Sequence, residues 1–135
     1  MEIISVPGGD IYHIIKKSNI DFLDFGEAYI SSIFPGHIKA WKMHKSMTVN
    51  LVVPFGKVKF VIFDDKNSSD SSLGYSEIIL SPHNYKRLTI PPMNWFGFKG
   101  LGSEVSLVFN IANIEHDPYE IERREIDEFN YDWEN

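Results

Sequence analysis

The chain has 135 residues, and 43% of them are hydrophobic and 14% aromatic, which is enough apolar side chain for the core of one domain. Its 19 acidic and 13 basic residues give a formal net charge of −6, so the average surface repels a phosphate backbone and nucleic acid is not an expected partner. The absence of cysteine excludes disulfides and thiolate metal sites.

The N-terminus gives no sign of a targeting segment. It reads MEIISVPGGDIYHIIKK, without a basic start followed by a long apolar core. No run elsewhere approaches the roughly 20 apolar residues that a membrane-spanning helix needs. We therefore expect a cytoplasmic protein with no membrane partner.

Turn residues divide the first part of the chain into short strands. Gly8-Gly9 separates two brief apolar runs, which predicts a strand pair or an edge strand. The next expected strand covers residues 28–33 and ends at Pro35-Gly36.

The central stretch, residues 39–65, reads as three short strands. Two of them, 49–53 and 58–63, are rich in β-branched and aromatic residues. Pro54-Phe55-Gly56 supplies turn residues between these two strands, and this pattern predicts a hairpin.

The remainder continues as short strands, expected over residues 76–80, 87–90, 94–98 and 104–112. The segment KNSSDSSLG, residues 66–74, has no period and is expected to be an exposed loop. Many short strands with no helical period between them predict an all-β sandwich, jelly roll or barrel.

The C-terminal stretch from Asp117-Pro118 onward is acidic and aromatic. Residues 118–124 could form one or two helical turns, and we expect Tyr131 and Trp133 to pack back on the barrel. This stretch carries three carboxylates, Glu125, Asp127 and Glu128. They either form a solvated face, or one of them orients a catalytic histidine as in a catalytic triad.

His44 is the strongest candidate for chemistry. Strict alternation over residues 40–45 places Ala40, Lys42 and His44 on one face of a strand and Trp41, Met43 and Lys45 on the other. An imidazole titrates near neutral pH, so His44 can take or give a proton if its face lines a cavity. The alternative is a surface or satisfied core histidine. We expect the other four histidines to be exposed to solvent: His13, His37, His83 and His116.

Basic residues cluster around His44, namely Lys39, Lys42 and Lys45. The cluster is either a solvated edge or a patch that holds a diphosphate while Trp41 or Trp95 stacks on a base. No second histidine or carboxylate falls at ligand spacing from His44, so we expect no transition metal and no cofactor. Nucleophile elbows and phosphate-binding loops are absent.

Four segments taken together resemble the dTDP-4-dehydrorhamnose 3,5-epimerase (RmlC-type) family of cupins: AWKMH (40–44), VVPFGKVKFVIFD (52–64), IPPMNWFGF (90–98) and YDW (131–133). The resemblance implies a single cupin-type jelly-roll β-barrel over residues 1–135 that forms a homodimer. It also implies binding of a nucleotide-linked 4-keto-6-deoxy sugar, with dTDP as the expected nucleotide, in deoxysugar or polysaccharide biosynthesis.

The same resemblance assigns roles to residues. His44 matches the family base, which removes the proton beside the ketone. Lys39 or Lys42 would bind the diphosphate or the enolate oxygen, and Trp41 and Trp95 would offer stacking surfaces. The family lysine of the hairpin's first strand falls near Val49 or Asn50, and Asn50 is taken as a further substrate-binding candidate.

The sequence also departs from the family pattern. Phe96 replaces the histidine of the Pro-Pro turn, and Val108-Phe109 stand where the acid tyrosine falls. A phenyl ring cannot donate a proton. We expect an epimerase or isomerase with His44 as general base. The alternatives are a non-catalytic sugar-nucleotide-binding or regulatory cupin, and an interaction domain whose pocket is filled by side chains.

Overall fold

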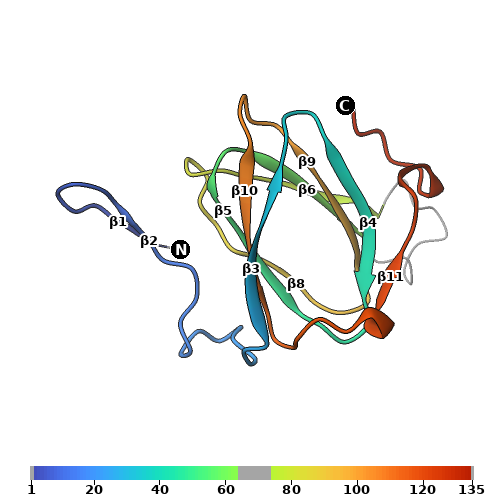
Figure 1. Cartoon of the computed structure of the whole chain (residues 1–135), viewed down its shortest axis with the longest axis horizontal. Coiled ribbons are helices and arrows are strands. Elements are labelled where there is room, and N and C mark those ends of the chain that lie inside the picture. The colour runs from blue at the N-terminus through green and yellow to red at the C-terminus, as the bar shows by residue number, and fades with distance from the viewer. Residues whose placement is uncertain (1, 64–73, 135) are drawn as a thin grey trace.

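The computed structural model describes residues 2–63 and 74–134, whose two larger antiparallel sheets pack face to face as a jelly roll (Figure 1). We name each sheet after a central strand. The β5 sheet has the order β3 (Glu27–Ile33), β10 (Ser106–Ala112), β5 (Val49–Phe55) and β8 (Leu88–Ile90). The β4 sheet has the order β11 (Ile121–Arg123), β4 (Ile38–His44), β9 (Trp95–Gly100), β6 (Val58–Phe63) and β7 (Ser76–Leu80).

The all-β jelly roll expected from the sequence is confirmed. Each strand buries alternate side chains between the sheets, where the main core lies. The fully buried members of this core include Val49, Leu51, Val53, Val58 and Phe60. Apart from Gly74, the loop expected over 66–74 lies outside the described residues.

The prediction that residues 49–53 and 58–63 form a hairpin is wrong. Both strands exist, but β5 pairs with β10 and β8, whereas β6 pairs with β9 and β7 in the other sheet. The turn between them carries the chain from one sheet to the other. Gly56 has φ of +89°, and a Cβ there would lie 2.2 Å from the Ser106 hydroxyl oxygen, so the crossing needs glycine. Turn residues indicate that the chain reverses, but they do not indicate which strands pair afterwards.

A second apolar cluster covers the outer face of the β4 sheet. The C-terminal segment runs beside β4 on that side (Figure 1). Trp133 is only 6% exposed, and its ring packs against Trp41 and Tyr131. The prediction that Tyr131 and Trp133 pack back on the barrel is therefore confirmed. The buried members of this outer cluster are Trp41, Met43, Val61, Phe63, Trp95 and Trp133.

The stretch expected to form helical turns over 118–124 divides into two elements. A single 3₁₀ turn, Pro118–Glu120, is capped by Asp117, whose side chain accepts a hydrogen bond from the Tyr119 N–H at 2.9 Å. Residues Ile121–Arg123 then form β11, the edge strand beside β4. Only the first half of that prediction is confirmed.

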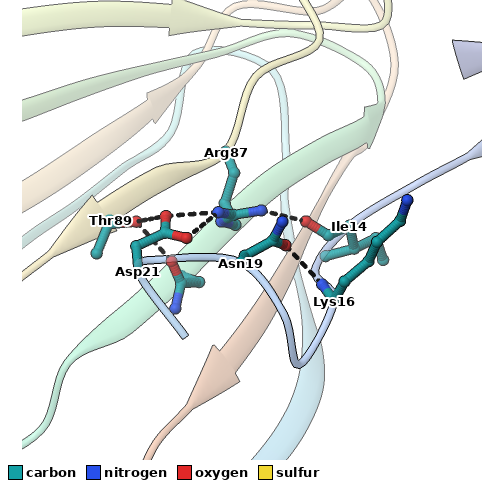
Figure 2. A network of polar contacts seen from close by, with 7 residues as sticks. Ile14, Lys16, Asn19, Asp21, Arg87 and Thr89 are labelled. Carbon is teal, nitrogen blue, oxygen red and sulfur yellow. Dashed lines mark hydrogen bonds and ion pairs between the residues drawn. The ribbon is translucent and has the colours of Figure 1, made fainter. Parts of the chain in front are cut away.

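The N-terminal segment begins with a small hairpin of β1 (Ile3–Ile4) and β2 (Ile11–Tyr12), which stands away from the barrel (Figure 1). The expected strand pair is thus confirmed. Figure 2 shows how the following segment is held: the Arg87 guanidinium donates to both Asp21 carboxylate oxygens, at 2.6 and 2.5 Å, and to the Ile14 carbonyl at 2.6 Å. This bidentate pair also lowers the pKa of Asp21. None of the described residues forms a helix long and apolar enough to cross a membrane.

Candidate active site

A pocket of about 690 Å³ opens between the two sheets. This volume lies in the range of pockets that bind small molecules. The β4 sheet contributes Lys42, Phe96, Phe98 and Arg123 to its walls, and the β5 sheet contributes Tyr29, Ser31 and Asn110. Arg124, Glu125 and Glu128, which follow β11, complete the edge together with Lys39.

The alternation of β4 is as the sequence predicts from Trp41 to His44, but Ala40, expected on the face of Lys42 and His44, packs against the outer cluster, and the pairing of β4 with β9 shifts register between Lys39 and Lys42. Trp41 and Met43 belong to the outer cluster, and Lys42 lines the pocket. His44 is 5% exposed, and its imidazole stacks on the Phe96 ring with the centroids 6.1 Å apart. The pocket-lining residues include Lys42 and Phe96 but not His44. The imidazole is therefore buried beside the pocket, set back from the wall that these two residues form.

The carboxylate partner of His44 is Glu120. The Glu120 side chain accepts a hydrogen bond from His44 Nδ1 at 2.5 Å, and its second oxygen accepts from the backbone N–H groups of Ser46 and Met47, each at 3.2 Å. The pairing of Ile121 with His44 between β11 and β4 places Glu120 at this position. Glu120 is 7% exposed, so the dyad is buried.

Sequence reasoning missed Glu120 and named three later carboxylates instead. Glu125 and Glu128 border the pocket, and Asp127 is exposed. The turn at Asp117-Pro118 indicates that the chain changes direction just before Glu120. No local pattern reveals that the next three residues pair with β4.

The electrostatics of the dyad favour an ionised carboxylate and a neutral imidazole. Burial opposes ionisation of Glu120, but its hydrogen bonds from His44, Ser46 and Met47 outweigh that effect and lower its pKa. Burial also lowers the pKa of His44, and the nearby Lys42 adds to this shift, although Glu120 opposes it. Because a carboxylate only accepts hydrogen bonds, Nδ1 carries the proton and Nε2 keeps its lone pair.

Cationic side chains surround this neutral base. Burial, with Arg123 and Lys39 nearby, lowers the pKa of Lys42, whose ammonium lies 5.3 Å from the centre of the Phe96 ring. The Lys39 ammonium donates to the Ser32 carbonyl at 2.7 Å while lining the pocket. Sequence reasoning did not identify Arg123 or its neighbour Arg124. Lys45, by contrast, does not line the pocket, and its Nζ lies 3.6 Å from Oε1 of Glu122.

The two tryptophans expected to stack on a base are both almost fully buried. Trp41 borders the pocket, but it is 2% exposed, and its indole N–H donates to the Ile126 carbonyl at 3.2 Å. Trp95 is also 2% exposed and packs against Phe129. Both side chains belong to the outer cluster of the β4 sheet, so the stacking prediction is wrong for Trp95, which does not line the pocket, and stays a prediction for Trp41, which does.

Asn50 was also expected to bind substrate, and this prediction is wrong. Val49 and Leu51 face the core, so Asn50 points to the outer face of the β5 sheet. There its amide oxygen accepts a hydrogen bond from Thr89 at 2.6 Å, beside the Arg87–Asp21 pair. Asn50 therefore belongs to the contacts that hold the N-terminal segment. Among the described residues no group of three potential metal ligands occurs, and the expectation of a metal-free site stays a prediction.

No family model matches the chain. Among curated proteins, the probable low-salt glycan biosynthesis epimerase Agl13 of Haloferax volcanii is 30% identical over 103 residues, covering 73% of this chain. The chain spans 66% of that relative's length.

Solved structures of other proteins share the fold, as two examples illustrate. The dTDP sugar isomerase of Desulfovibrio desulfuricans G20 is 36% identical with a TM-score of 0.87, over 94% of this chain and 82% of that one. The dTDP-4-dehydrorhamnose 3,5-epimerase of Sulfolobus tokodaii is 20% identical with a TM-score of 0.80, over 96% of this chain and 76% of that one. The fold and its inter-sheet pocket are those of the cupin class. Within this class, the chain belongs to the RmlC-type family, as its sequence motifs indicate.

Proposed function

We propose that the chain is an epimerase or isomerase of a nucleotide-linked 4-keto-6-deoxy sugar, with His44 as the general base. The observation that carries this proposal is the buried His44–Glu120 dyad, joined by a 2.5 Å hydrogen bond beside a pocket lined with cations. A carbonyl group acidifies the neighbouring C–H, and a neutral imidazole held by a carboxylate is a suitable acceptor for that proton.

The cations match the charges that such a reaction develops. Loss of the proton leaves an enolate, whose oxygen carries negative charge, and we assign the stabilisation of that charge to Lys42, which lines the pocket. Arg123, Arg124 and Lys39 line the same pocket and supply positive charge for a diphosphate. The similarity to a dTDP sugar isomerase supports dTDP as the nucleotide.

Solvent exchange tests the proposal directly. The purified chain is incubated with dTDP-4-keto-6-deoxyglucose in D₂O, and deuterium at the carbons beside the ketone is followed by NMR. We expect exchange in the intact protein and its loss in His44→Ala. His83→Ala, which changes an exposed histidine outside the pocket, is the matched control and should exchange normally. Absence of exchange in the intact protein would contradict the enzymatic function.

One observation favours a second candidate, a non-catalytic sugar-nucleotide-binding or regulatory cupin. Phe96 stacks on His44, and His44 does not itself line the pocket. Calorimetry separates the two functions, because binding of the sugar nucleotide without any deuterium exchange would select the binding module. Absence of both binding and exchange would exclude both functions.

We also propose a homodimer. The β1–β2 hairpin stands away from the barrel, and the segment that follows exposes Leu23 at 63% and Phe25 at 61% (Figure 1). Apolar side chains grouped in this way are typical of a protein–protein interface. Light scattering should give twice the mass of the chain, and the mass of a single chain would contradict this proposal. The cytoplasmic location expected from the sequence stays a prediction.

A further inference from the structure

Phe96 packs against both of the ionisable side chains that β4 turns toward the pocket. It lies on β9 directly opposite Lys42, and His44 is the next residue on the same face of β4. Diagonal neighbours on two paired strands are within reach of an aromatic side chain. Accordingly, the Lys42 ammonium lies 5.3 Å from the centre of the Phe96 ring, and the His44 imidazole stacks on that ring at 6.1 Å with 28° between the two planes.

The hydrogen bond to Glu120 does not by itself fix the imidazole of His44. It holds one atom, Nδ1, and leaves the ring free to tilt about that contact. A second flat ring stacked on the imidazole restricts this tilt, because aromatic pairs have preferred geometries. With Nδ1 and the ring plane both held, the direction of Nε2 is defined, and Nε2 is the atom that takes the proton.

Phe96 is itself held firmly. Its strand, β9, lies inside the β4 sheet between β4 and β6, so the backbone is hydrogen-bonded on both sides. The side chain is 3% exposed. A group on such a strand is placed with less freedom than one on a loop. Phe96 therefore has the rigidity that a positioning residue needs.

The same ring also limits the access of water to the base. Phe96 lines the pocket, whereas His44, stacked beside it, does not. Burial is the main cause of the lowered pKa of His44, to which Lys42 on β4 and Arg123 on β11 add, while Glu120 opposes it. Phe96 contributes to this burial without any charge of its own.

We propose that Phe96 is a positioning residue of the active site, whose ring fixes the plane of the His44 imidazole and shields it from water in the pocket. This inference rests on the proposed function. Phe96 transfers no proton, because a phenyl ring has none to give, and it acts only through the base.

The first test is kinetic. Phe96→Leu keeps an apolar side chain but removes the flat ring, and Phe96→Met is a second ring-free variant that should behave in the same way. Exchange with dTDP-4-keto-6-deoxyglucose in D₂O is measured on the pH plateau, where the base is neutral in every variant. The maximal rate should fall by about 100-fold, the cost of misplacing a reacting group by about 1 Å, while KM changes by a few-fold at most.

The second test observes the imidazole directly and needs no activity. Its C–H signals are titrated by NMR, and those of His44 are identified by their absence in His44→Ala. The titration should move to higher pH in Phe96→Leu, because water then reaches the imidazole. Phe98→Leu is the matched control for this titration. Phe98 lines the same pocket from the same strand, but its ring packs against Phe60, with the centroids 5.5 Å apart, so the His44 titration should not move.

The other outcomes contradict the inference. A raised KM with an unchanged maximal rate in Phe96→Leu would show that the ring only contacts the substrate. An unchanged titration of His44 would show that the ring does not shield it, and an equal shift in Phe98→Leu would show a general loosening of the pocket. Absence of exchange in wild type contradicts the proposed function, whereas the titration still tests the role of Phe96, so the two failures are distinguishable.

Discussion

The two faces of the β4 sheet serve different purposes although they are built from the same strands. On β4, Lys42 and His44 face the pocket side, where the groups are ionisable and the space between the sheets is partly open. Trp41 and Met43, their immediate neighbours, face outward into the aromatic cluster beneath the C-terminal segment. Because side chains alternate along the strand, its ionisable residues face the pocket and its apolar residues pack on the other side.

The C-terminal segment connects the two faces. Its 3₁₀ turn places Glu120 against His44 on the inner side, and farther along Trp133 covers the outer side. Substitutions on the inner face should therefore change activity while the fold persists. Substitutions on the outer face should change stability while the activity of each folded molecule persists.

The largest effect is expected for Glu120→Gln on the inner face. Glutamine keeps the size of the side chain but lacks the charge that orients the imidazole and stabilises its protonated form. Replacing the triad aspartate of a serine protease by asparagine costs about 10⁴-fold in kcat, and by analogy we expect an exchange rate lower by ~10³-fold or more. The rate of deuterium incorporation measures it.

Asp127→Asn is the matched control, because Asp127 is an exposed carboxylate of the same segment that does not line the pocket. Its exchange rate should stay at the wild-type level. An exchange rate of Glu120→Gln close to that of wild type would show that the activity does not depend on the His44–Glu120 dyad.

On the outer face, Trp133→Ala should destabilise the protein by about 3–5 kcal/mol, the usual cost of removing a buried tryptophan. The 6% exposed ring packs against Trp41 and Tyr131, so its loss leaves a cavity under the C-terminal segment. Urea unfolding measures the change. The exchange rate per folded molecule should stay within a few-fold of wild type, and a large loss of rate in folded protein would break the distinction between the faces.

A smaller effect concerns pH. The pKa of His44 lies below its usual value of 6.5, so the base stays neutral and active down to a pH below 6.5. Lys42→Met removes a positive charge that disfavours the imidazolium, which raises the pKa of His44. The acid limb of kcat/KM should therefore move to higher pH, as measured by exchange rates across the pH range.

Lys45→Met provides the control for this shift. Lys45 is exposed, and its ammonium lies near Glu122 rather than in the pocket. The acid limb should not move, and the free energy of unfolding should change by less than about 1 kcal/mol, as for other surface ion pairs. An equal shift of the acid limb in both variants would show that Lys42 acts only through net charge.

The pairing of β5 and β6 shows where sequence reasoning reached its limit. The bounds of both strands followed from β-branched and aromatic residues, and the turn at Gly56 followed from its residue types. Their assignment to different sheets depends on β8, β9 and β10, which come later in the chain. Local residue types do not carry that information.

The sequence by itself determined the strand class, the alternation of β4 from Trp41 to His44 and the presence of one imidazole on the same face as Lys42. These features follow from backbone sterics and side-chain direction, which act over a few neighbouring residues. The tertiary structure decided which carboxylate meets that imidazole, since Glu120 is 76 positions away. It also turned Trp95 and Asn50 away from the pocket and brought Tyr29 and Arg123 into it. Such contacts depend on strand register between distant segments, and register is fixed only when the sheets pack.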